Sequence, residues 1–395
     1  MTRRNGAGLA LVAAAAWLGA AAASAQTGPG VSASEVRLGS WQPLSGPVSI
    51  YGVPVRAGAD AYFNLVNEQG GIKGRKIKFI VEDNAFNPQR TVAAARKLIG
   101  SDEVLAIAVA FGTGPSAAAF PYVLQQEKTP FVTPYAGAEE WFAPPRPGLL
   151  SAQVLYENQA ATVGRWAVKD DRKSILVIHS DPAAYHKPGE AAVAAIRKAN
   201  PSAKVEALSV KWGTQDYAPI ALDVLRRAPD AVIQIAVVQE VASLAKELRQ
   251  QNSQVPIYTY SPNVTQSLPL LGGPAVEGIK SVSWTVPATL DNPALREYRA
   301  ALAKYAPDQK PDFDSLLSFG FAKIVAEALR RADEPLNRTS FLEGFYKLKG
   351  YDTGILPPVT FAPDKPLGLS TLQRVVLKSG IWEAVGEPVD STAEW

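Results

Sequence analysis

Hydrophobic positions in the first half of the chain alternate between short apolar runs and longer segments with helical spacing. Val55, Ala59, Tyr62 and Val66 recur on one helical face, as in an amphipathic helix. Residues 104–111 are continuously apolar, which is typical of a parallel strand covered on both faces. The pattern predicts strands at 35–41, 76–82, 104–111 and 129–133, and helices at 53–68, from Pro88 to about Gly100, and from Pro115 onward.

The same rhythm restarts in the middle of the chain. It predicts strands at 174–179, 205–210, 231–236 and 257–260, and helices at 157–168, 189–200, 217–227 and 239–251. Alternation of this kind indicates βαβ units and parallel sheets. After a short strand at 281–284, the pattern predicts three consecutive helices at 293–305, 315–331 and 339–347, and hairpin-like strands from Val359 onward.

Two successive α/β runs predict two lobes, each a doubly wound α/β sheet. We expect the chain to cross between them near 152–155, 282–284 and 371–374. The predicted division is lobe 1 at 35–153 plus 284–372, and lobe 2 at 154–283 plus 373–395. Ligands of open α/β sheets bind beyond the carboxyl ends of the strands, and interdomain clefts are common ligand sites. A ligand site between the lobes follows.

The N-terminus has the features of a secretory signal peptide at residues 1–25. Arg3 and Arg4 precede an apolar run at 9–23, and Ala23-Ser24-Ala25 is a small-residue cleavage site. The run is shorter than the ~20 residues that span a bilayer, although an uncleaved anchor is the alternative. We therefore expect a soluble, periplasmic mature protein.

Composition narrows the classes of function. The formal net charge is only +3, and the chain has no cysteine and two histidines, His179 and His186. A charge this small gives no electrostatic case for binding nucleic acid, and the missing thiols exclude a thiolate nucleophile or zinc-thiolate site. No G-x-S-x-G, H-E-x-x-H or Walker A motif is present. We expect neither an enzyme nor a metal or cofactor site.

Three loops follow predicted strands of the first lobe and are candidates for ligand binding. They are Pro43 to Tyr51, Gly112-Thr113-Gly114-Pro115-Ser116, and Thr133 to Ala138. The second loop opens a helix, whose free amides and dipole favour an anion, although its glycines could equally form only a tight turn. Four aromatic residues at strand ends, which could wall a cleft or simply pack, are Trp41, Tyr51, Tyr135 and Tyr185.

Four short sequence strings follow one another along the predicted first lobe. They are Pro43-Leu44-Ser45-Gly46-Pro47, Tyr51-Gly52, Asn67-Glu68-Gln69-Gly70-Gly71-Ile72-Lys73-Gly74 and Glu82-Asp83-Asn84. With them, the chain resembles the periplasmic substrate-binding proteins of branched-chain amino-acid (Leu/Ile/Val-binding) type ABC importers. The similarity continues more weakly through 181–185, 213–216 and 354–361. The resemblance implies a type I periplasmic binding protein fold with three hinge crossings, a monomer, closure on a small-molecule ligand and delivery to an ABC transporter permease.

The family's ligand-binding residues carry over only in part. The carboxylate-binding serine falls on Gly114, with Thr113 and Ser116 nearby, and a binding threonine falls on Gly137. The second-lobe tyrosine is kept as Tyr185, whereas a second tyrosine becomes Val237 and the ammonium-binding acid falls near Pro262. The paired cysteines of some members fall on Phe86 and Thr113. Asp314 is a candidate replacement for the missing acid.

The resemblance therefore implies a ligand site but does not identify the ligand. The expected ligand is a small amino acid or related carboxylate; the alternatives are an aromatic or other apolar carboxylate, or a ligand-sensing role. A hydrolase on the same scaffold lacks a nucleophile–base pair. The predicted ligand-binding residues are Trp41, Tyr51, Gly112, Thr113, Gly114, Ser116, Tyr135, Ala136, Gly137, Tyr185 and Asp314.

Overall fold

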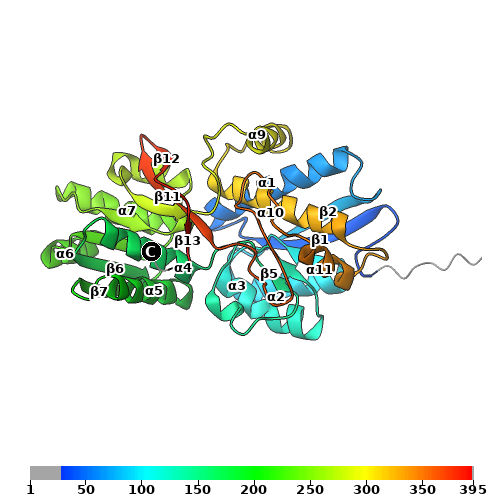
Figure 1. Cartoon of the computed structure of the whole chain (residues 1–395), viewed down its shortest axis with the longest axis horizontal. Coiled ribbons are helices and arrows are strands. Elements are labelled where there is room, and N and C mark those ends of the chain that lie inside the picture. Colours follow the sequence, from blue (N-terminus) through cyan, green and yellow to red (C-terminus); the bar gives the residue numbers. More distant parts are fainter. Residues whose placement is uncertain (1–27, 394–395) are drawn as a thin grey trace, which may run out of the picture.

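The computed structural model describes residues 28–393. The signal peptide expected at 1–25 lies outside the described residues. Within 28–393, no helix has both the length and the apolar character needed to cross a membrane. The molecule has two lobes that lie end to end along its longest axis (Figure 1).

The first lobe contains a sheet of five parallel strands in the order β2-β1-β3-β4-β5. Leu38, Ala106 and Ala108 face a core shared with α1, α9, α10 and α11, whereas Ile107 and Phe131 face a second core built by α2 and α3. The strands are β1 (Glu35–Gln42), β2 (Lys76–Asp83), β3 (Ala106–Ala108), β4 (Phe131–Val132) and β5 (Leu149–Leu150); the helices are α1 (Ser49–Glu68), α2 (Pro88–Arg96), α3 (Thr113–Phe120), α9 (Pro293–Tyr305), α10 (Phe313–Arg331) and α11 (Arg338–Tyr346).

The second lobe repeats this topology. Its parallel strands follow the order β7-β6-β8-β9-β10, and β11, β12 and β13 extend the sheet in antiparallel fashion. The strands are β6 (Ser174–Ser180), β7 (Lys204–Val210), β8 (Ala231–Ile235), β9 (Ile257–Thr259), β10 (Lys280–Ser283), β11 (Thr371–Lys378), β12 (Ile381–Ala384) and β13 (Val389–Asp390); the helices are α4 (Tyr156–Lys169), α5 (Ala183–Ala199), α6 (Ala218–Arg227), α7 (Val238–Gln250) and α8 (Ser267–Gly272).

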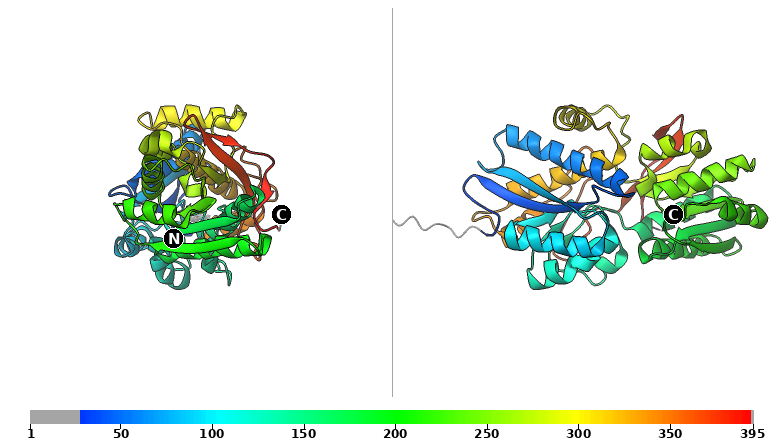
Figure 2. Two further views of the ribbon diagram at one scale, coloured as in Figure 1. Left: turned by 90° about the vertical axis from the view of Figure 1, so that its left-hand side faces the viewer. Right: turned by 180° about the vertical axis from the view of Figure 1, so that it is seen from behind.

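Three chain crossings join the lobes. The chain leaves the first sheet between β5 and α4, returns between β10 and α9, and enters the second sheet again at β11. The helices α9 to α11 consequently pack in the first lobe, where α10 lies along α1 (Figure 2). The α/β fold with two doubly wound sheets and three crossings is as predicted. The residue-level division of the lobes remains a prediction.

Two helices begin at least four residues earlier than predicted, and both shifts change the interpretation of a tyrosine. The first helix starts at Ser49 rather than Val53, and α5 starts at Ala183 rather than Gly189. Each contains a proline at its sixth position, which leaves the carbonyl four residues earlier without its usual intrahelical hydrogen bond. Tyr51 and Tyr185 are therefore third residues of helices, not loop residues.

The strand predicted at 104–111 is shorter in the structure, where β3 ends at Ala108. Val109 has φ of +55°, and Thr133, just after β4, has φ of +45°. These left-handed values change the direction of the chain where the two strands end. They are costly for β-branched residues, and the surrounding structure must hold them in place. The bends direct the following loops toward the second lobe.

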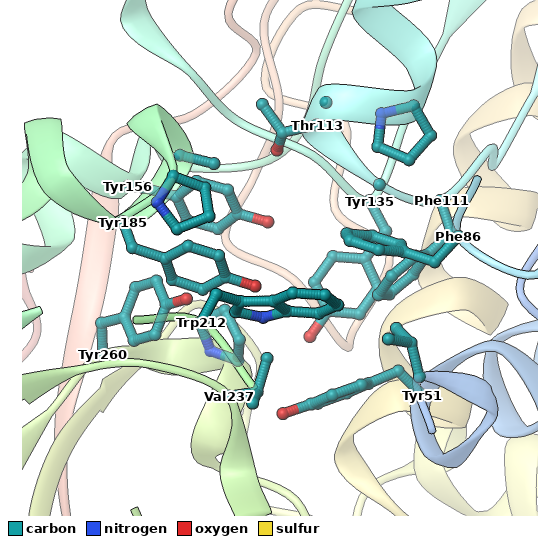
Figure 3. A pocket seen from close by; sticks show the side chains of 17 residues that line it. Tyr51, Phe86, Phe111, Thr113, Tyr135, Tyr156, Tyr185, Trp212, Val237 and Tyr260 are labelled. Carbon is teal, nitrogen blue, oxygen red and sulfur yellow. The ribbon is translucent and has the colours of Figure 1, made fainter. Parts of the chain in front are cut away.

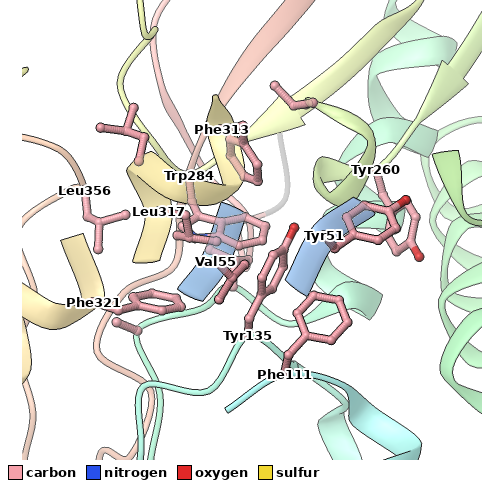
Figure 4. Close-up of a cluster of buried hydrophobic side chains, with 14 of the residues drawn as sticks. Tyr51, Val55, Phe111, Tyr135, Tyr260, Trp284, Phe313, Leu317, Phe321 and Leu356 are labelled. Atoms are coloured by element: carbon pink, nitrogen blue, oxygen red, sulfur yellow. The ribbon is translucent and has the colours of Figure 1, made fainter. Parts of the chain in front are cut away.

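A buried aromatic cluster lies where the two lobes meet (Figure 4). Tyr135 contacts Trp284 edge-on at 6.3 Å between ring centroids, and Trp284 contacts Phe313 at 5.6 Å. These rings join the loop after β4, the second crossing and the first residue of α10. The core of the first lobe therefore continues to the wall of the space between the lobes.

Candidate ligand-binding site

A cavity of about 780 Å³, including its open mouth, lies between the lobes. Its lining residues all follow the carboxyl end of a strand, and each strand from β1 to β9 contributes at least one (Figure 3). The lining is Val48, Tyr51, Phe86, Phe111, Gly112, Thr113, Gly114, Pro115, Tyr135, Tyr156, Pro182, Ala184, Tyr185, Trp212, Val237, Tyr260 and Pro262. This is the edge at which parallel α/β sheets bind ligands.

The two lobes present equivalent tyrosines to the cavity. Tyr51 is the third residue of the helix after β1, and Tyr185 is the third residue of the helix after β6. Both stand in a Y-x-x-P string, ending at Pro54 and Pro188 respectively. The cavity thus lies between matching ends of two similarly wound sheets.

Aromatic rings dominate the wall. Tyr51 stacks on Phe111 with 6.0 Å between centroids, and Phe111 contacts Tyr135 edge-on at 5.0 Å. From the second lobe, Tyr260 contacts Tyr156 at 5.5 Å. The aromatic lining residues are Tyr51, Phe86, Phe111, Tyr135, Tyr156, Tyr185, Trp212 and Tyr260. Such rings suit the body of an apolar or aromatic ligand.

The described part of the cavity lining contains no Lys, Arg, His, Asp or Glu. Burial raises the pKa of Tyr156 to about 12 and raises the pKa of Tyr51, Tyr135, Tyr185 and Tyr260 above the ordinary value. These hydroxyls therefore stay protonated and neutral at physiological pH. The wall offers neutral hydrogen-bonding groups rather than fixed charges.

The N-terminus of α3 forms one polar end of the cavity. Thr113 and Gly114 are its first two residues, and amides at such positions have no acceptor inside the helix. A Cβ added to Gly114 would meet nothing within 4 Å, so the backbone is open to an approaching ligand. At Gly112, with φ of +101°, a Cβ would lie 2.9 Å from the Phe86 ring; this tight entry to the helix requires glycine.

Direct contacts between the lobes border the cavity. The Tyr51 hydroxyl accepts a hydrogen bond of 2.7 Å from Val238 N, the first amide of α7. The rings of Phe86 and Trp212 lie 6.2 Å apart across the lobes. At the rim, Lys187 Nζ pairs with the Glu140 carboxylate, and Gln239 Nε2 donates to Pro47 O at 3.0 Å. The two lobes are therefore in contact around the cavity, which leaves space for a small ligand.

The structure brings six of the predicted residues together on the cavity wall. They are Tyr51, Gly112, Thr113, Gly114, Tyr135 and Tyr185. The other five do not line the cavity.

Trp41 and Ser116 lie behind the wall, both with no exposed surface, and Trp41 Nε1 donates to Ser116 Oγ at 3.0 Å. Ala136 belongs to the core beneath α3. Gly137 lies against Gln153, where a Cβ would come within 2.6 Å of Nε2. Their small or hydrogen-bonded side chains thus support the loops instead of contacting the cavity. Asp314 is also buried and reaches the cavity only through Tyr135, whose hydroxyl oxygen lies within hydrogen-bond distance of Asp314 Oδ1, at 2.9 Å.

Sequence reasoning missed several wall residues. Phe111, Tyr156, Trp212 and Tyr260 were not singled out, although each stands within a few residues of a strand end. Phe86 entered only as the position of a missing cysteine. An aromatic residue in the segment after the carboxyl end of every strand from β1 to β9 except β8 is the signal that would have found them. The second Y-x-x-P string was likewise available.

Among residues 28–393, no group of three His, Cys, Asp or Glu side chains could hold a metal ion. The two histidine rings contact each other at 4.8 Å, and His186 Nε2 lies 3.2 Å from Glu190 Oε1. The chemistry that the cavity offers is accordingly reversible binding through neutral hydrogen bonds, backbone amides and apolar surface.

A periplasmic binding protein family model matches residues 35–370. The chain belongs to the periplasmic binding protein family. Membership implies a periplasmic location and confirms the resemblance drawn from the first-lobe strings. The match spans both sheets up to the third crossing.

Curated relatives are similar at low identity. The Leu/Ile/Val-binding protein BraC3 of Rhizobium johnstonii is 27% identical over 203 residues, which cover 50% of this chain and 54% of that protein. This match therefore spans about half the length of BraC3. The Leu/Ile/Val-binding protein of Escherichia coli K12 is 22% identical over 335 residues, covering 83% of this chain and 87% of that protein.

Solved structures of this fold are named for different ligands. A branched-chain amino acid ABC transporter protein of Thermus thermophilus with bound valine has a TM-score of 0.81 at 19% identity, covering 92% of this chain and 98% of that chain. A fatty acid ABC transporter substrate-binding protein of Thermomonospora curvata has 0.80 at 23%, covering 93% and 95%. A solute-binding protein of R. palustris in complex with 4-hydroxybenzoate has 0.77 at 20%, covering 91% and 98%. The type I periplasmic binding protein fold is shared, and it does not specify the ligand.

Proposed function

We propose that this protein captures a small carboxylate with an apolar or aromatic body between its lobes and delivers it to the permease of an ABC importer. The observation that carries the proposal is the lining of the cavity, which combines eight aromatic side chains with no charged side chain among the described residues. A buried ammonium group needs an anionic or hydrogen-bonding partner. Val237 and Pro262, which line the cavity, offer no side-chain acceptor where the resemblance expects a tyrosine and an acid.

In this proposal the amides of Thr113 and Gly114 bind the carboxylate. The positive end of the α3 dipole and the unpaired N–H groups favour an anion there. The Thr113 hydroxyl adds a neutral donor on the same turn. The rings of the second lobe then cover the apolar body of the ligand, and burial of that surface contributes to the free energy of binding.

We further propose that the ligand shifts the protein toward the closed arrangement. Residues 35–153 with 284–372 would move as one lobe and 154–283 with 373–395 as the other, about the three crossings. A ligand that contacts both walls binds the closed form better, and this difference in affinity drives closure. Removal of residues 1–25 would leave the mature protein in the periplasm.

A small amino acid is the second candidate ligand. The curated relatives are named for leucine, isoleucine and valine binding, and the α3 amides would suit an α-carboxylate equally well. A receptor that senses the closed form would use the same cavity, so the two roles differ only in the partner that recognises closure.

Isothermal titration calorimetry of three ligand classes tests the proposal. The panel contains branched-chain amino acids, aromatic carboxylates such as benzoate and 3-phenylpropanoate, and medium-chain carboxylates such as hexanoate. We expect saturable heats for carboxylates without an ammonium group, accompanied by a smaller radius of gyration in small-angle scattering. Binding of leucine alone, or binding with no compaction, would overturn the proposal. Loss of uptake in a strain that lacks the chain would distinguish transport from sensing.

A further inference from the structure

Asp314 is a fully buried carboxyl group directly behind the cavity wall. It is the second residue of α10 and has no exposed surface. Its Oδ1 lies 2.9 Å from the Tyr135 hydroxyl oxygen, within hydrogen-bond distance, and no hydrogen bond to its Oδ2 is present among the described atoms. Tyr135 itself lines the cavity. The carboxyl group can therefore influence a ligand through one phenol.

A second carboxyl group beside Asp314 takes the available donors. Asp312, the N-cap of α10, accepts from Phe313 N at 2.6 Å, Gln266 N at 2.9 Å and Thr265 Oγ1 at 3.0 Å. Hydrogen bonds to a carboxylate favour its charged form. Since like charges at close range disfavour double ionisation, the proton of this pair belongs on Asp314.

The remaining surroundings of Asp314 also favour the neutral acid. The other titratable groups that face it are Tyr51, Tyr135, Tyr156 and Tyr298, from four different segments, and none of them is a cation. Burial first, and then the charge of Asp312, raises the pKa of Asp314 well above its ordinary value, and the contacts with the Tyr135 and Thr265 hydroxyls oppose this shift without cancelling it. A neutral carboxylic acid has one proton to donate, and the Tyr135 oxygen is the acceptor at hand.

We propose that Asp314 is a positioning residue that donates its proton to the Tyr135 oxygen and so leaves the Tyr135 hydroxyl to donate into the cavity. This inference rests on the proposed function, and it names a specificity determinant for that site. The pair would favour a ligand that places an acceptor oxygen at Tyr135. It would disfavour an ammonium or amide N–H at the same point, because two donors would then face each other.

Three variants separate this role from a merely structural one, with 3-phenylpropanoate as the probe. Asp314→Asn keeps a donor for the Tyr135 oxygen, Asp314→Leu has a similar size but no donor, and Tyr135→Phe lacks the hydroxyl. In calorimetry at several pH values we expect Asp314→Asn to bind within about 3-fold of the unchanged protein, whereas the other two lose ~10-fold or more. Unchanged binding by Tyr135→Phe, or equal losses in Asp314→Asn and Asp314→Leu, would overturn the inference.

A ligand-free measurement keeps the inference independent of the choice of probe. Infrared spectra in deuterated buffer should contain the carbonyl band of a buried protonated carboxyl group. We expect this band to vanish in Asp314→Asn and to shift in Tyr135→Phe. The shift in Tyr135→Phe reports on Asp314 even if Asp314→Asn does not fold. Absence of a band that responds to Tyr135→Phe contradicts the inference. A band present without binding of any panel compound would instead count against the proposed function.

Discussion

The hydroxyl of Tyr51, on α1 of the first lobe, accepts a hydrogen bond of 2.7 Å from the backbone N–H of Val238, which opens α7 of the second lobe. The same phenol lines the cavity. A first-turn amide has no acceptor within its own helix, so the bond satisfies a donor that the open arrangement would leave to water. One side chain thus joins the lobes directly and also forms part of the binding site.

Replacement of this hydroxyl should weaken closure without unfolding either lobe. In Tyr51→Phe the ring can still stack on Phe111, while the cross-lobe hydrogen bond is lost. A neutral hydrogen bond contributes about 0.5–1.5 kcal/mol, so we expect affinity for a bound carboxylate to fall by roughly 2- to 12-fold with little change in Tm. Calorimetry and thermal unfolding measure the two quantities. Tyr305→Phe, which removes an exposed hydroxyl bonded to Glu68, is the matched control; equal affinities in both variants would contradict the role of Tyr51.

Phe86 and Trp212 should show an energetic coupling only when the lobes are closed. The two rings are 6.2 Å apart and belong to different lobes. Aromatic pairs contribute about 0.5–1.5 kcal/mol beyond burial, and a double-mutant cycle isolates such a term. We expect Phe86→Ala and Trp212→Ala to show coupling of this size in the free energy of ligand binding, and none in the free energy of unfolding without ligand. Strictly additive binding losses would show that the rings do not meet in the bound state.

A methyl group at Gly114 should separate binding from folding. The site has open space around an added Cβ and no left-handed φ, so Gly114→Ala fits sterically and should stabilise the fold by about 0.4–1 kcal/mol by lowering the entropy of the unfolded chain. We expect stability to stay level or rise, whereas affinity for carboxylates falls because the methyl group covers the amides at the α3 terminus. Gly100→Ala, whose added Cβ would have only Tyr122 Oη within 4 Å, at 3.6 Å, is the control. Full affinity in Gly114→Ala would remove the α3 amides from the binding site.

The raised pKa of Asp314 predicts a distinct dependence of stability on pH. The folded protein holds a proton that the unfolded chain releases above about pH 4, so unfolding becomes easier as pH rises from there toward the folded pKa. The slope for one such group is about 1.4 kcal/mol per pH unit. Asp314→Asn lacks this term, and we expect its stability relative to the unchanged protein to increase steadily above about pH 4. Denaturant unfolding of both proteins at a series of pH values measures the difference; a constant difference would mean that Asp314 ionises normally.

Hydrophobic patterning predicted the two α/β runs, because most strands and helices show their period or a continuous apolar run in the sequence, whereas the short β5 and α8 were not predicted. The starts of α1 and α5 were placed late since proline is typical of the first helical turn, whereas Pro54 and Pro188 are the sixth residues of their helices. This error hid the equivalence of Tyr51 and Tyr185. Trp41 shows the converse limit: it stands at a strand end like the wall residues, but its indole points to Ser116 and the core.

The position of a residue after a strand does not show whether its side chain faces the cavity or the core. Ser116 and Gly137 stand in the correct loops, yet hydrogen bonding and close approach to Gln153 direct them away from the cavity. Such placements depend on tertiary packing rather than on local sequence.

The central claim is that the cavity binds a carboxylate whose body carries no ammonium group. The most direct test is the ratio of the dissociation constants of L-phenylalanine and 3-phenylpropanoate, measured by calorimetry, because the two acids differ only in that group. We expect 3-phenylpropanoate to bind more tightly by ~10-fold or more, since a desolvated ammonium lacks a charged partner on the wall. Equal or tighter binding of L-phenylalanine, with L-leucine likewise preferred over 4-methylpentanoate, would contradict the claim.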